Sequence, residues 1–257
     1  MYIDDIEDEL EEPDDTDLNK QQADQVNRKP ALISIFVDDT KTARTVKDTT
    51  DQKQMQGLID RLGEWSKRWD LRFNVEKCKI FHAGQTNPRF QYNLYGQQLQ
   101  STVAEKDVGV ILTPDLRPSK MVARAASRAN QVLGAWARSV SWRDKVTWIG
   151  IYKMYVRPKL EYCSQAWSPW TEGDIETLEK VQQRAVRTVT TLPRDMSYKE
   201  KLKLLGLTPL VERRERGDMI QMYRCIGGQD TVGYKPFFTL QSELQRPGPS
   251  TRVRTGH

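Results

Sequence analysis

The sequence predicts an α+β fold in which a small antiparallel sheet with one long helix comes first and an all-helical domain follows. The spacing of apolar residues predicts this order, because strand-like runs end near Pro114 and helical steps of three or four begin near Lys120. A chain of 257 residues can also bury two modest cores. We therefore expect a flexible acidic and polar connector over residues 1–30, an α+β domain over 31–113, a helical domain over 114–240 and a disordered tail over 241–257.

The first domain opens with a predicted β-hairpin. Residues 31–37 are a dense apolar run that ends at Asp38 and Asp39, and residues 40–46 alternate as a strand would. Residues 51–69 then carry an apolar stripe at steps of three or four, which predicts an amphipathic helix. Short strands are expected around residues 73–81, 92–99 and 108–112.

The second domain is predicted to consist of helices separated by proline and glycine. The five predicted helices cover residues 121–140, 145–156, 175–192, 198–205 and 210–226, with separators at Pro158, Pro169, Pro193, Gly206 and Pro209. We expect Trp65 and Trp69 in the core of the first domain, and the five later tryptophans in the core of the second. These five are Trp136, Trp142, Trp148, Trp167 and Trp170.

Charge is distributed unevenly along the chain. The first 19 residues contain 10 acidic and no basic residues, so residues 20–257 hold 40 basic and 25 acidic residues and a net charge of +15. Such an excess is typical of proteins that bind a polyanion such as nucleic acid, although many basic proteins do not. No run is long and apolar enough to span a membrane, and we expect no signal peptide because the start is acidic where a signal peptide is basic. We therefore expect a nuclear or cytoplasmic protein.

Few residues favour a disulfide or a zinc site. The three cysteines (Cys78, Cys163 and Cys225) lie far apart, which favours buried free thiols over disulfides. The two histidines have no cysteine at zinc-site spacing.

Asp38 and Asp39 are the candidate metal ligands. Paired carboxylates at the tip of a rigid hairpin supply the hard oxygen atoms that Mg²⁺ binds in two-metal nucleotidyl transfer. A purely local interpretation is also open, because aspartate favours turns and the chain contains other Asp-Asp pairs at residues 4–5 and 14–15.

Several segments in order resemble reverse transcriptases of the non-LTR, LINE-type retrotransposon family. Phe36-Val-Asp-Asp-Thr-Lys41 resembles the metal-binding hairpin of that family, usually F-A-D-D-T-K, with Val37 in place of alanine. Residues 74–79 (Asn-Val-Glu-Lys-Cys-Lys) and 105–110 (Glu-Lys-Asp-Val-Gly-Val) resemble its next palm motif and the strand near its primer grip. Residues 152–163, 167–169 and 178–184 match its following helical region, so the resemblance runs from about residue 31 to about 240.

The resemblance implies the C-terminal half of a palm over 31–113 and a thumb-like domain over 114–240. In the family, the hairpin aspartates and one from an earlier palm strand hold two Mg²⁺ ions for deoxynucleotide addition to a DNA primer on an RNA template. Residues 1–6 resemble the segment just before the hairpin, so we expect the fingers and that earlier aspartate to be absent. We therefore expect weak Mg²⁺ binding at Asp38 and Asp39 and no polymerase activity from this chain alone.

The remaining site residues are basic. The resemblance places Lys77 near the leaving pyrophosphate, although a solvated lysine in a turn fits this chain better. The candidate nucleic-acid contacts are Lys41, Arg124, Arg128, Lys180, Arg184 and Arg187. A thumb binds the backbone of the primer–template by such residues, but a solvated helix face paired with nearby glutamates is equally open.

Two alternatives to a polymerase fragment stay open. One is a noncatalytic module that binds nucleic acid, and the other is a degenerate relic without a selected role. In either case, palm surface left uncovered would favour self-association.

Overall fold

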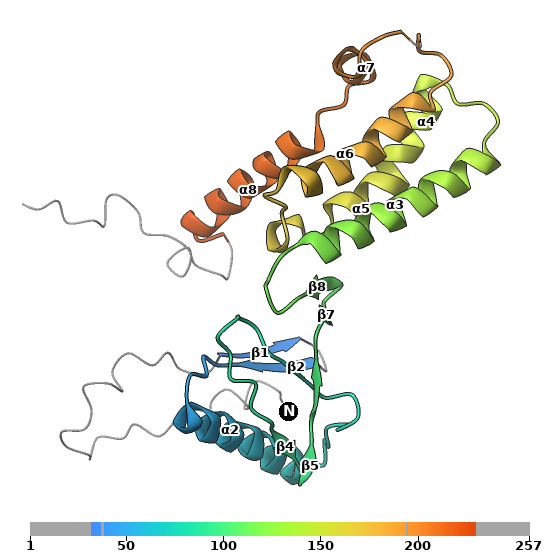
Figure 1. Cartoon of the computed structure of the whole chain (residues 1–257). Helices are drawn as coiled ribbons and strands as arrows, with labels where there is room; N and C mark the ends of the chain where they lie inside the picture. Colours follow the sequence, from blue (N-terminus) through green and yellow to red (C-terminus); the bar gives the residue numbers. More distant parts are fainter. Residues whose placement is uncertain (1–31, 37–38, 194, 230–257) are drawn as a thin grey trace, which may run out of the picture. The chain divides into compact units, whose positions relative to one another are not determined.

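The computed structural model describes residues 32–36, 39–193 and 195–229, so the predicted connector and tail lie outside the described residues. The chain divides into two compact units, Met1–Pro118 and Ser119–His257. Strands and one helix form the described part of the first unit, and helices form that of the second (Figure 1). The predicted α+β class is confirmed.

The first unit begins with an antiparallel hairpin followed by a long helix. Strand β1 (Leu32–Phe36) pairs with β2 (Asp39–Ala43), and α2 covers Thr49–Arg68. Asp48 caps α2, because its side chain accepts hydrogen bonds of 2.8 and 3.0 Å from the backbone N–H groups of Thr50 and Asp51. The apolar face of α2 then buries Leu58, Leu62 and Trp65 in a core against Ile33, Met55 and Phe73.

The rest of the first unit differs from the single antiparallel sheet that was expected. The described strands form separate two-stranded pairs, namely β1–β2, β4–β5 (Asn93–Leu94 and Gln97–Gln98), β7–β8 (Glu105–Asp107 and Val110–Leu112) and the parallel pair β3–β6 (Lys79–Phe81 and Gln100–Thr102). Tyr95 and Gly96 join β4 to β5 with φ of 53° and 77°. Two consecutive positive φ angles are typical of a tight two-residue hairpin turn.

The second unit is helical throughout its described residues. Its elements are α3 (Ser119–Ser139), α4 (Lys145–Ile151), the π-helix η2 (Tyr152–Val156), α5 (Arg157–Glu161), the 3-10 turn η3 (Ser164–Ala166), α6 (Glu172–Arg187), α7 (Tyr198–Leu205) and α8 (Leu210–Ile226). Helix α3 lies along α6 and α5 (Figure 1). The completely buried side chains of Trp148, Leu160 and Leu178 form part of this core.

The prediction that Pro158 separates two helices was wrong. Helix α4 passes into the π-helix and then into α5, and Pro158 lies in the first turn of α5. Pro158 has no backbone N–H to donate, and it directly follows the wider π-helical turn, in which the N–H of Arg157 bonds to the carbonyl oxygen of Tyr152.

Three of the seven tryptophans are exposed and Trp136 is half-buried, whereas all seven were expected in the core. Trp69 caps the C-terminal end of α2 with 36% of its surface exposed, whereas Trp142 and Trp170 lie between helices and are 72% and 65% exposed. Among the cysteines, Cys225 is buried, Cys78 is half-buried and Cys163 is exposed, and all three are free thiols. No helix among residues 32–229, the gaps excepted, is long and apolar enough to cross a membrane.

Candidate nucleic-acid interface

The β1–β2 hairpin presents one described carboxylate at the end where β1 stops and β2 begins. Phe36 pairs with Asp39 in the strand register, so Asp39 is the first residue of β2. Its side chain is exposed. Asp38, the other candidate metal ligand, lies outside the described residues.

Lys41, two residues further along β2, forms an ion pair with Asp107 of β7. The pair joins the hairpin segment 36–41 to the segment 105–110, both of which carry the family resemblance. The two side chains keep 38% and 34% of their surface exposed. A phosphate group at Lys41 would therefore compete with the Asp107 carboxylate. Asp107 was included in the segment 105–110, but this ion pair was not predicted from the sequence.

Lys77 lies in a turn organised by Asn74. The side-chain oxygen of Asn74 accepts hydrogen bonds of 3.0 and 3.3 Å from the backbone N–H groups of Glu76 and Lys77. This local pattern is common for asparagine in turns, and the Lys77 side chain is exposed. The geometry supports a structural role for the turn and leaves the lysine ammonium accessible.

The described residues do not fit a complete two-metal centre. In the part of the chain that the structure describes, no three His, Cys, Asp or Glu side chains come together as metal ligands would. In general, two adjacent carboxylates bind Mg²⁺ weakly unless a further ligand fixes the metal position.

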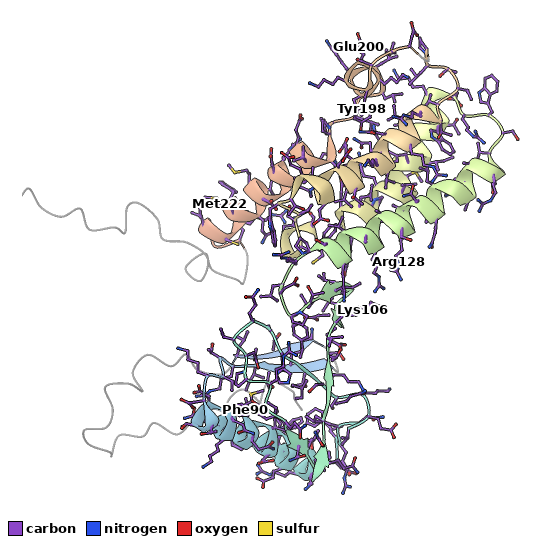
Figure 2. The ribbon with its side chains drawn as sticks, viewed as in Figure 1. Phe90, Lys106, Arg128, Tyr198, Glu200 and Met222 are labelled. Atoms are coloured by element: carbon purple, nitrogen blue, oxygen red, sulfur yellow. The ribbon has the colours of Figure 1, made fainter. Side chains whose placement is uncertain are left out.

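Helix α3 carries basic residues on the side opposite its buried face. Val122 and Ala129 are completely buried, whereas Arg128 is exposed and Arg124 is half-buried. Arg128 points outward from the helix in Figure 2. Neither arginine forms an ion pair with another described residue, so both charges are available to an anion.

Helix α6 places three further basic residues on one exposed stripe. Lys180 pairs with Glu176 at 3.3 Å, and the two side chains are each 62% exposed. Arg184 donates a 3.2 Å hydrogen bond to the side chain of Asn130 on α3. Arg187 forms no ion pair within the described residues. The expectation of partial pairing with glutamate thus applies to Lys180, while Arg184 links two helices.

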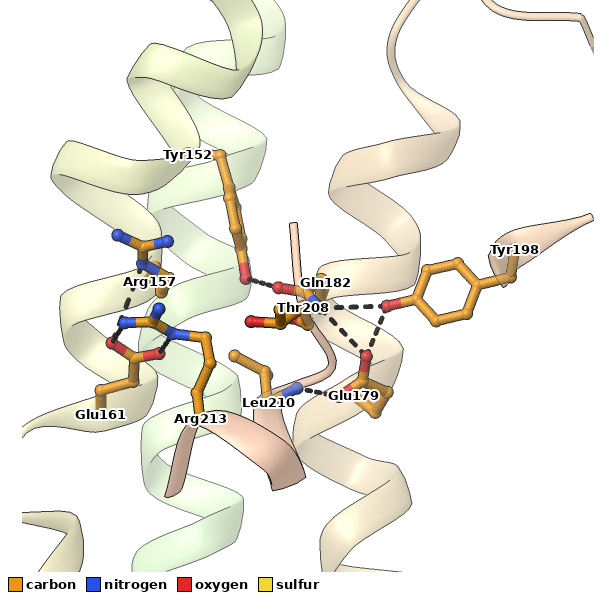
Figure 3. A network of polar contacts seen from close by, with 9 residues as sticks. All are labelled: Tyr152, Arg157, Glu161, Glu179, Gln182, Tyr198, Thr208, Leu210 and Arg213. Atoms are coloured by element: carbon orange, nitrogen blue, oxygen red, sulfur yellow. Dashed lines mark hydrogen bonds and ion pairs between the residues drawn. The ribbon is translucent and has the colours of Figure 1, made fainter. Parts of the chain in front are cut away.

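A buried polar network joins four segments of the helical unit (Figure 3). Tyr152 of the π-helix donates a 2.7 Å hydrogen bond to Gln182 Oε1, and Gln182 Nε2 donates to Glu179 and to the backbone oxygen of Thr208 at 3.0 and 3.1 Å. Glu179 also accepts from the hydroxyl of Tyr198. Burial raises the pKa of Tyr152, and burial together with the Glu179 bond raises the pKa of Tyr198. Both phenols therefore stay protonated at neutral pH.

Two basic residues of α8 have structural positions that the sequence did not indicate. Arg213 forms a forked pair with Glu161, with Nε–Oε1 and Nη2–Oε2 distances of 2.5 and 3.1 Å. This hydrogen-bonded partner raises the pKa of Arg213. Arg214 is only 4% exposed, and its two terminal nitrogens have no hydrogen-bond partner among the described residues. Burial lowers the pKa of Arg214.

Comparison with known proteins gives two similar sequences, both from Drosophila melanogaster. The RNA-directed DNA polymerase from mobile element jockey is 22% identical over 192 residues, which cover 71% of this chain and 21% of that protein. The probable RNA-directed DNA polymerase from transposon X-element is 27% identical over 171 residues, which cover 62% of this chain and 18% of that protein. The chain is a distant homologue of RNA-directed DNA polymerases.

The homologous region spans about a fifth of the length of these two polymerases. No protein-family model matches the chain. No solved structure matches it either.

Proposed function

We propose that this chain is the C-terminal palm and thumb portion of a non-LTR, LINE-type reverse transcriptase, and that its helical unit binds a primer–template duplex. The distant homology to RNA-directed DNA polymerases supports the enzyme class. The observation that carries the binding proposal is the pair of basic stripes on α3 and α6.

The stripes suit a duplex because their basic side chains can contact backbone phosphates, and such contacts do not depend on base sequence. Arg128 and Arg187 are exposed and form no ion pair with another described residue, so phosphate binding breaks no existing pair at either position. Lys180 and Arg184 sit on the same stripe of α6 as Arg187 and add to its positive charge. Contacts of this kind release counterions from the backbone, so affinity falls steeply with salt.

Binding of a labelled DNA primer annealed to an RNA template tests this proposal. The variant Arg128→Gln/Arg187→Gln should bind several-fold more weakly, and its log–log salt slope should be lower by about two if each arginine contacts one phosphate. The variant Lys199→Gln/Lys203→Gln removes the same charge from the exposed side of α7 and should bind as the unmodified chain does. Equal weakening in both variants would show that binding depends only on the net charge of the chain, and it would contradict the proposal.

For catalysis we propose that Asp38 and Asp39 hold Mg²⁺ only together with a further carboxylate from another polypeptide segment. The purified chain should then bind the duplex without extending the primer. Extension by the chain alone, abolished in Asp38→Asn/Asp39→Asn and retained in the control Asp60→Asn/Asp70→Asn, would overturn this part of the proposal.

A noncatalytic nucleic-acid-binding module is the second candidate. The Lys41–Asp107 pair favours it. Lys41, in strand β2 of the β1–β2 hairpin, is ion-paired with a carboxylate and so is not free to contact a nucleotide. Duplex binding that is unchanged in Asp38→Asn/Asp39→Asn, together with no extension when further polymerase segments are supplied, would support it.

A further inference from the structure

Helix α8 has an apolar stripe on the side that the helical unit leaves uncovered. Met219, Met222, Tyr223 and Ile226 are 66%, 43%, 69% and 39% exposed. Their spacing of three, one and three residues places them on one face of the helix. Met222 is labelled in Figure 2 near the C-terminal end of α8.

The opposite face of α8 makes the contacts with the rest of the unit. Leu210, Arg214 and Cys225 are buried at 0%, 4% and 8% exposure, and α8 packs against α6 and η3. The helix therefore buries an arginine on its packed side while large apolar side chains remain outside. A contiguous apolar stripe of this size on a surface helix is typical of a surface that packs against something else.

The end of α8 indicates which part of the chain can reach the stripe. Gly228 adopts a φ of 64°, and the backbone N–H of Gln229 bonds to the carbonyl oxygen of Arg224 at 3.0 Å. This pattern ends the helix abruptly and takes the chain off the helix axis. The stripe from Met219 to Ile226 is about 10 Å long, and five extended residues after Gln229 span up to about 17 Å.

The sequence that follows contains a suitable apolar segment at that distance. Residues 234–240 (Tyr-Lys-Pro-Phe-Phe-Thr-Leu) include four large apolar residues, whereas residues 245–257 include only Val253. We propose that the segment 234–240, which lies outside the described residues, packs in cis on the apolar stripe of α8. Phe237 and Phe238 would supply most of the apolar surface that covers Met219 and Met222.

Methionine oxidation tests the proposal because the same unit contains one exposed and one buried methionine with which Met219 and Met222 can be compared. Met154 is 65% exposed, nearly the same as Met219, while Met121 is 5% exposed and reports whether the unit stays folded. In the full chain treated with dilute hydrogen peroxide, peptide mass spectrometry should show Met219 and Met222 oxidised several-fold more slowly than Met154. Met219 oxidised as fast as Met154 would overturn the proposal without any substitution.

A pair of variants then identifies the segment. Phe237→Ser/Phe238→Ser should raise the oxidation rate of Met219 to that of Met154 while Met121 stays slow. The control Val253→Ser should leave Met219 slow. If Met219 stays slow to oxidise in the double variant, something other than segment 234–240 covers the stripe, and the proposal is overturned. If that slow oxidation is then lost on dilution, the covering partner is a second copy of the chain.

Discussion

The hydroxyl of Tyr152 donates a 2.7 Å hydrogen bond to Gln182 and so joins the π-helix to α6 inside the helical unit. Both side chains are completely buried. Tyr152 and Gln182 belong to two different segments that carry the family resemblance, residues 152–163 and 178–184. The hydrogen bond gives these two residues a structural role that requires no contact with substrate.

Tyr152→Phe should destabilise the helical unit. The substitution removes the donor and leaves Gln182 Oε1 buried without a partner, which costs about 1–3 kcal/mol. Urea unfolding followed by circular dichroism should show a lower midpoint. Tyr155→Phe, at a residue that is 44% exposed, is the matched control and should change the midpoint little. Equal midpoints for the two variants would contradict the proposed role of the network.

Arg214→Met should stabilise the same unit. Methionine has a similar length and removes a buried cation whose terminal nitrogens have no hydrogen-bond partner among the described residues. Relief of that desolvation is worth roughly 1–3 kcal/mol. The neighbouring Arg213→Met removes the forked pair with Glu161 and should destabilise. A lower unfolding midpoint for Arg214→Met would show that a partner outside the described residues satisfies this arginine.

Ser197→Ala should cost more stability at pH 7 than at pH 3. Ser197 and Glu200 form a capping box at the start of α7, and these hydrogen bonds lower the pKa of Glu200 below its usual 4.5. A lowered folded-state pKa means that the stabilisation is present above pH 4.5 and is lost as the pH falls through the folded-state value. The difference between wild-type and variant unfolding midpoints, measured at both pH values, checks this. A pH-independent difference would exclude the Glu200 carboxylate as its source.

The first unit should self-associate through apolar side chains on its surface. Leu32, Leu71 and Val103 are 66%, 58% and 74% exposed. Light scattering of the purified chain should give a mass that rises with concentration, and Leu71→Gln/Val103→Gln should reduce that rise. The exposed pair Trp142→Gln/Val146→Gln in the helical unit is the control. A mass that stays at the monomer value at all concentrations would contradict the prediction.

Helices were predictable where one periodic pattern covers their whole length. The apolar stripe over residues 51–69 predicted α2 to within two residues, and the predicted ranges 198–205 and 210–226 match α7 and α8. The π-helix was not predictable, because a wider turn at Tyr152–Val156 leaves no separate signal in the spacing. Trp142 and Trp170 were misassigned because periodicity says nothing about side chains that lie between helices.

The sequence predicted which residue types lie at the candidate site better than it predicted which of them form ion pairs. Exposed basic residues on α3 and α6 follow from helical spacing alone. The Lys41–Asp107 and Glu161–Arg213 pairs join residues 66 and 52 positions apart, so no local pattern indicates them. Glu179 is one of the glutamates near these basic residues, but it accepts hydrogen bonds from the Tyr198 hydroxyl and from the backbone N–H of Leu210.

The parallel pairing of β3 with β6 has a consequence for the order in which the first unit folds. Lys79–Phe81 can align with Gln100–Thr102 only after the intervening chain has closed into a loop, and the β4–β5 hairpin lies within that loop. A two-residue turn closes at a far smaller entropic cost than the longer loop. The hairpin should therefore form early and shorten the effective loop, so that substitutions in β3 mainly accelerate unfolding while those at Tyr95 and Gly96 slow folding.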